Sequence, residues 1–120
     1  MSILSAFNNT LIEFADDLIL VFPDDNDLKI YKNSLILLQK TNPRKVQTIF
    51  HTYIIHYKDQ ILNRDEHFFL NDNYDTVKDE KNIVLIDRLK NYWSNISNSN
   101  KDKIWKYFEI LISLSFKCSN

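Results

Sequence analysis

Hydrophobic residues recur along this chain three and four positions apart, the spacing of an α-helix that buries one face. In the first segment this stripe consists of Leu4, Phe7, Leu11, Phe14, Leu18 and Val21. Ser5 is expected to cap the helix, and Pro23 stops it because proline has no N–H to donate. The pattern therefore predicts a first helix over residues 5–22.

The same periodicity predicts four more helices. Asn42-Pro43 suits the start of one of them, because Asn caps well and proline fits the first helical position. Asn63 is expected to end that helix in the left-handed conformation, and Asn100 is expected to cap the last one. The expected helices are residues 5–22, 27–40, 43–62, 79–93 and 101–117, with an irregular connection over 63–78. No segment alternates hydrophobic and polar residues for long enough to predict a strand. The sequence therefore predicts an all-α, compact bundle of about five helices and no sheet. One domain is expected, over residues 1–120.

Composition excludes several functional classes. The chain has 120 residues, 44% of them hydrophobic and 26% charged, as in soluble globular domains. It contains no glycine, so it has no P-loop, dinucleotide-binding fingerprint or nucleophile elbow. The single cysteine, Cys118, cannot form an internal disulfide, and residues 1–10 lack the basic start of a signal peptide. A reducing interior, cytosolic or nuclear, is the expected location, and no segment is apolar for long enough to predict a membrane span.

Charges are segregated along the chain although the formal net charge is only −1. Residues 1–27 sum to −6, residues 28–58 to +6, residues 59–80 to −5 and residues 81–120 to +4. Two interpretations follow: neighbouring elements neutralise each other, or the block over 28–58 is a basic patch for an acidic partner. In the second case Lys40, Arg44, Lys45 and Lys58 would contact a nucleic-acid backbone.

Candidate metal and catalytic motifs are incomplete. His51 and His56 are five residues apart, about 140° around a helix, so they do not converge on one ion. Asn71, Asn73 and Asp75 resemble the start of a calcium loop, but the glycine and glutamate required later in that loop are missing. Adjacent carboxylates on one helix point in different directions, so they do not form the paired acid and base that catalysis would need. No cofactor, metal site or catalytic residue is expected, and the chain is not expected to be an enzyme.

An apolar cluster interrupts the otherwise polar connection over residues 63–78. Phe68, Phe69 and Leu70 follow the acidic pair Asp65-Glu66 and do not continue any helical stripe. Such a cluster either packs back onto the bundle or anchors a partner protein. The partner-binding hypothesis assigns Phe68 and Phe69 as anchors, with Asp65 and Glu66 as the polar rim.

Three short motifs suggest a viral family: Val21-Phe22-Pro23-Asp24, Asn42-Pro43-Arg44 and Phe68-Phe69-Leu70. Together they make the chain, over about residues 7–116, similar to short all-helical proteins of nucleocytoplasmic large DNA viruses, the giant viruses. The resemblance implies a viral helical protein and transfers no catalytic residues.

The leading hypothesis from the sequence is a non-enzymatic viral protein that acts through protein–protein interaction, in the virion or in the cytoplasm or nucleus of the infected cell. Its partner would be a viral or host protein, with homo-oligomerisation as a further possibility. A nucleic-acid-binding module that uses residues 28–58 is the alternative, and no membrane association is expected.

Overall fold

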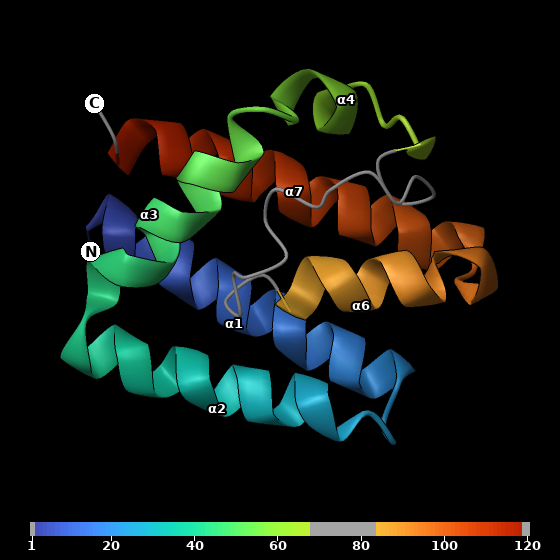
Figure 1. Cartoon of the computed structure of the whole chain (residues 1–120), viewed down its shortest axis with the longest axis horizontal. Coiled ribbons are helices and arrows are strands. Elements are labelled where there is room, and N and C mark those ends of the chain that lie inside the picture. Colours follow the sequence, from blue (N-terminus) through green and yellow to red (C-terminus); the bar gives the residue numbers. More distant parts are fainter. Residues whose placement is uncertain (1, 68–83, 119–120) are drawn as a thin grey trace.

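The computed structural model describes residues 2–67 and 84–118, with backbone only over 84–87, and these residues form helices without any strand. The elements are α1 (Ile3–Val21), α2 (Asn26–Thr41), α3 (Pro43–Ile54), α4 (Lys58–Leu62), α6 (Val84–Tyr92), the 3-10 turn η3 (Trp93–Asn95) and α7 (Asn98–Cys118) (Figure 1). This confirms the predicted all-α bundle. Phe68, Phe69 and most of the predicted connection lie outside the described residues, as does the start of the helix predicted over 79–93.

α1 and α7 begin earlier than predicted, because a serine upstream of the expected cap takes that role. Ser2 caps α1, and its side chain accepts a hydrogen bond of 3.0 Å from the backbone N–H of Ser5. Ser97 likewise accepts one of 3.2 Å from the N–H of Asn100, and α7 begins at Asn98. Asp25 caps α2, and its carboxylate accepts hydrogen bonds from the N–H groups of Asp27 and Leu28.

The core is built around α1 and α7, which run antiparallel. The start of α1 contacts α3 through the Asn8 amide, which donates to the carbonyl of Pro43 at 2.8 Å. The end of α7 contacts α3 too, because the Gln47 amide donates to the carbonyl of Ser115 at 3.1 Å. The α1 stripe is buried from Phe7 to Leu18. α2 packs on the other side of α1, and α6 packs on α2 (Figure 1).

The single helix predicted over residues 43–62 is wrong, because the chain leaves the α-helix after Ile54. The N–H of Tyr57 bonds to the carbonyl of Ile54 at 2.9 Å, a three-residue spacing typical of a turn. Residues 52–57 are all β-branched or aromatic, and such residues have low helix propensity. The turn places α4 against α7 (Figure 1). Ile61 of α4 is fully buried there.

The predicted left-handed residue at the end of this segment is displaced by one position. Asn63 has φ of −85°, whereas Arg64 has φ of 54°. The N–H of Asp65 bonds to the carbonyl of Gln60 and the N–H of Arg64 to that of Ile61, which defines a Schellman motif. From this position the Arg64 side chain pairs with Asp102 at 2.7 Å and with Glu109 at 3.2 Å, both on α7.

Candidate functional site

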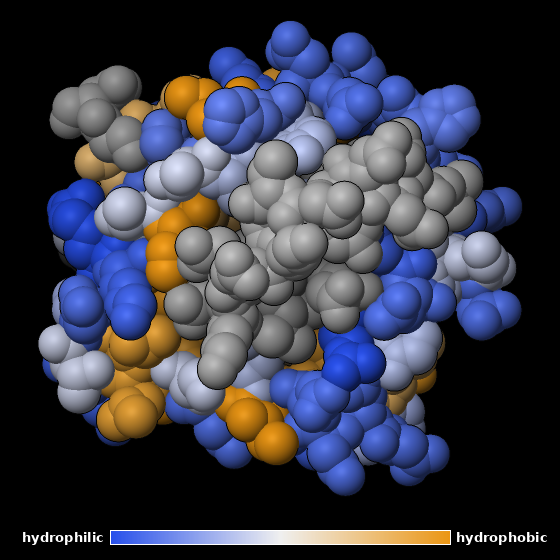
Figure 2. All heavy atoms as spheres, viewed as in Figure 1, coloured by the Kyte–Doolittle hydropathy of each residue, from blue (hydrophilic) through white to orange (hydrophobic). Residues whose placement is uncertain are grey.

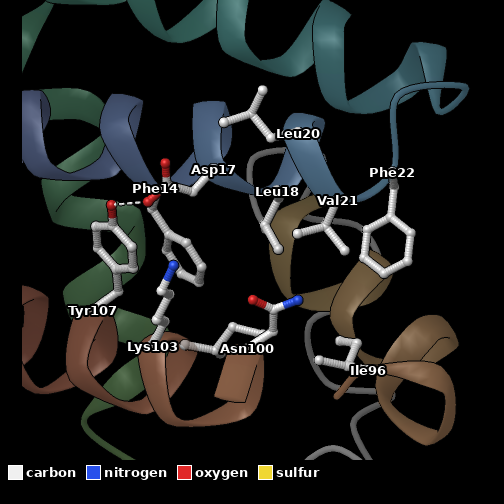
Figure 3. Close-up of a pocket in the computed structure, with 11 residues that line it drawn as sticks. Phe14, Asp17, Leu18, Leu20, Val21, Phe22, Ile96, Asn100, Lys103 and Tyr107 are labelled. Atoms are coloured by element: carbon white, nitrogen blue, oxygen red, sulfur yellow. Dashed lines mark hydrogen bonds between the residues drawn. The ribbon is translucent and has the colours of Figure 1, made fainter. Parts of the chain in front are cut away.

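A solvent-open groove lies between the C-terminal half of α1 and the N-terminal half of α7, and we call it the α1–α7 groove (Figure 3). Its cavity volume is about 120 Å³. Most of its wall is apolar, and three polar side chains and one lysine complete it. The lining residues are Phe14, Asp17, Leu18, Leu20, Val21, Phe22, Ile96, Asn100, Lys103, Ile104 and Tyr107.

The groove exists because, at this end, the chain leaves α1 in one direction and enters α7 from another. α1 stops at Val21, and Phe22 turns away to stack on Tyr92, with ring centroids 3.9 Å apart. α7 is preceded by η3, and Ile96 between the two elements forms part of the groove wall (Figure 3). Asn100 points into the space between the two helices, where a larger apolar side chain would close it (Figure 3).

Leu20 is the most exposed large hydrophobic residue at the groove. Its side chain is on the rim and is 79% exposed. It lies off the buried α1 stripe, so it does not stabilise the core. A leucine in this position leaves apolar area in water that a bound partner would cover.

The α1 rim of the groove is acidic. The Tyr107 hydroxyl donates a hydrogen bond to the Asp17 carboxylate (Figure 3). Burial and this hydrogen bond raise the pKa of Tyr107, with Glu13 adding to the effect, so the hydroxyl remains a donor. Asp24 lines a second, more open hollow that shares Val21 and Phe22 with the groove.

The partner-binding residues predicted from the sequence do not line this groove. Asp65 accepts a hydrogen bond of 3.0 Å from the N–H of His67, and Glu66 pairs with Lys101 at 3.5 Å. Both carboxylates therefore make contacts within the chain. Phe68 and Phe69 lie outside the described residues, so their proposed anchoring role stays a prediction.

The cations of the basic block predicted over residues 28–58 are divided among α2, α3 and α4. Lys32 pairs with Asp16 of α1 at 2.5 Å, so one end of the block is neutralised by a neighbouring helix. Lys40, Arg44 and Lys45 are exposed at the junction of α2 and α3, and none is in an ion pair with a described residue. Lys58 instead lies over the Phe116 ring, 4.7 Å from its centroid.

The sequence did not reveal the α1–α7 groove. Val21 continues the stripe and was predicted to be buried, but it is exposed because α7 covers only part of this end of α1. The one available signal was Leu20, a leucine beside the stripe just before a proline turn. In Figure 2 the hydrophobic residues visible on one face form separate patches among hydrophilic ones.

No protein-family model, curated protein or solved structure matches this chain. Among residues 2–67 and 84–118, no three His, Cys, Asp or Glu side chains gather as metal ligands would. None of the described helices is long and apolar enough to cross a membrane.

Proposed function

We propose that this chain is a non-enzymatic viral helical protein that acts by binding another protein, in the virion or in the infected cell. The α1–α7 groove is the docking site in this proposal. The observation that supports it most is an open apolar groove whose rim presents Leu20 to solvent. A volume of about 120 Å³ suits one large side chain, since pockets for drug-sized ligands measure roughly 300–1,000 Å³.

The charges around the groove indicate the charge of the partner segment. Glu13, Asp17 and Asp24 are exposed along one side of α1 and the turn after it, and Lys103 is the one cation in the groove lining. The matching partner segment presents a bulky apolar side chain flanked by lysine or arginine. Apolar burial would supply most of the affinity, and the opposite charges would favour this segment over acidic ones.

Two amphipathic peptides test this proposal on the full-length protein. They share the same leucine and phenylalanine positions, but one has lysines and the other glutamates on the polar face. We expect only the lysine peptide to raise fluorescence anisotropy on titration. Leu20→Asn should weaken its binding roughly tenfold, the effect of losing an interface anchor. The matched control is Leu37→Asn on α2, a leucine 61% exposed and outside the groove.

Asp17→Asn separates the charge from the hydrogen bond. Asparagine still accepts from the Tyr107 hydroxyl, so the groove keeps its shape while the rim loses one negative charge. We expect weaker binding of the lysine peptide and a smaller dependence on salt. Equal binding of both peptides, or an equal loss in Leu20→Asn and Leu37→Asn, would contradict the groove as the docking site.

The natural partner is tested by capture from infected-cell lysate with nuclease added. A protein captured by the wild type and Leu37→Asn, and lost with Leu20→Asn, supports docking in the groove. The double variant Phe68→Ala/Phe69→Ala tests the alternative anchor that the sequence predicted. Loss in that variant with full capture by Leu20→Asn would move the docking surface to that segment.

A further inference from the structure

Five cations belong to the elements that meet around α3 and the end of α7, and we call this region the basic end: Lys40, Arg44, Lys45, Lys58 and Lys117. Lys40 is at the end of α2 and Arg44 and Lys45 are in the first turn of α3. The end of α7 lies against this part of α3, as the bond from Gln47 to Ser115 shows. Lys117 follows Phe116, over whose ring Lys58 lies.

No carboxylate belongs to the chain segments that build the basic end. Residues 2–12, 33–58 and 110–118 contain neither aspartate nor glutamate. The acids that flank these segments in sequence are Glu13, Asp27, Asp59 and Glu109. Asp27 pairs with Arg88, and Glu109 pairs with Arg64. Asp59 is exposed on α4 beside Lys58.

Several acidic side chains elsewhere pair with cations of the chain, whereas no ion pair between described residues includes a cation of the basic end. Arg88 contacts both Asp25 and Asp27, and Lys32 contacts Asp16. In the part of the chain that the structure describes, none of the ion pairs includes a cation of the basic end. Among the described residues, its positive charge is therefore not neutralised by an ion pair, although the whole chain has a formal net charge of −1.

Uncharged hydrogen-bonding groups lie between these cations. Thr41 and Asn42 are exposed between Lys40 and Arg44. The Asn42 side chain makes no capping hydrogen bond to α3. Lysine, arginine and short polar side chains are the groups that contact phosphates in nucleic-acid complexes.

We propose that the basic end binds the phosphate backbone of double-stranded nucleic acid without reading the bases. A duplex presents phosphates at regular, short intervals, so several cations on different helices each find an anion without a shaped pocket. An acidic protein would need a complementary surface to contact the same cations together. This inference is independent of the α1–α7 groove, because none of its residues lines that groove.

The test is fluorescence anisotropy with the full-length protein and a short labelled DNA duplex of arbitrary sequence. We expect binding at low salt that weakens steeply as salt rises. Contact with four phosphates gives a slope of about −3.6 for log affinity against log salt. Arg44→Ala/Lys45→Ala should weaken binding about tenfold or more at low salt and bring the slope close to −2.

The matched control is Lys103→Ala/Lys106→Ala, which removes the same charge from α7 outside the basic end and should change both values little. Circular dichroism verifies that each variant keeps its helices. Absence of binding at low salt, or an equal loss in the two double variants, would overturn the proposal. So would polyglutamate binding that matches the duplex and depends equally on Arg44 and Lys45, since it would assign an acidic protein instead.

Discussion

Arg64 is the one described residue that combines a left-handed backbone with two ion pairs across helices. With φ of 54°, it occupies a conformation that costs any residue with a Cβ about 1 kcal/mol relative to glycine. The chain has no glycine for this position, and arginine offers contacts with Asp102 and Glu109 in return. The hydrogen bonds to these two carboxylates raise the pKa of Arg64 most, and the negative charges of the carboxylates raise it further.

A comparison of two substitutions isolates the backbone cost. Arg64→Ala and Arg64→Gly both remove the ion pairs, but only alanine keeps the Cβ in the left-handed conformation. We expect Arg64→Ala to be less stable than Arg64→Gly by about 1 kcal/mol in urea unfolding. Equal stability of the two variants would show that the turn relaxes when the guanidinium is absent.

Asp25 is a carboxylate whose ionisation is linked to the fold. Its side chain is only 5% exposed and accepts hydrogen bonds from the Tyr92 hydroxyl and from the N–H groups of Asp27 and Leu28. Burial acts to raise the pKa of Asp25, but these hydrogen bonds and the charge of Arg88 outweigh burial and hold it below its ordinary value of 3.8. The folded state therefore favours the carboxylate.

This linkage has a defined sign. A pKa that is lower in the folded than in the unfolded state stabilises the fold fully above the unfolded value, and the stabilisation disappears as pH falls through the folded value. The advantage of the wild type over Asp25→Asn should therefore be largest at neutral pH and shrink below about pH 4. Urea unfolding of both proteins across this range measures it, and two parallel pH profiles would contradict the linkage.

At the scale of the element, periodicity predicted which segments form helices but not where one helix stops. The stripe through Phe50, Ile54 and Ile61 is continuous in sequence, so a turn between α3 and α4 leaves no trace in the spacing. Low helix propensity over residues 52–57 was the available signal, and packing of Ile61 on α7 decided the outcome. The predicted caps of α1 and α7 were each misplaced by three residues, because a serine three positions upstream takes the capping role in both helices.

α4 has five residues, too few to form a stable helix alone, so its packing must stabilise it. Ile61 is fully buried against the bundle, and Leu62 beside it is 42% exposed. We expect Ile61→Ala to cost about 2–5 kcal/mol and to accelerate amide hydrogen exchange over residues 58–65 more than elsewhere. Leu62→Ala, the control, should change stability by less than about 0.5 kcal/mol. Uniform acceleration across all helices in Ile61→Ala would show that α4 does not open separately.

At the scale of the whole molecule, the fold determines which charges are paired, whereas the order of the charge blocks in the sequence did not. The sequence left open whether the positive block over 28–58 is neutralised or free. The fold does both: Asp16 of α1 pairs with Lys32, whereas Arg44 at the start of α3 is exposed and in no ion pair with a described carboxylate. The groove was equally beyond prediction, because its walls come from the two ends of the chain and depend on how α1 and α7 pair.

The pairing of chain ends also predicts how the molecule unfolds. α7 contacts α1, α3 and α4, and α6 contacts α2, so no described helix is packed only against its neighbour in sequence. Trp93 and Trp105 are buried with ring centroids 5.3 Å apart, and they report on the packing between η3 and α7. If residues 1–120 form one domain, loss of any helix exposes core shared by the others, and unfolding is a single transition. Tryptophan fluorescence and far-ultraviolet circular dichroism should then give the same urea midpoint. An earlier fluorescence midpoint with helicity retained would mean that α6, η3 and the start of α7 separate from the rest before global unfolding.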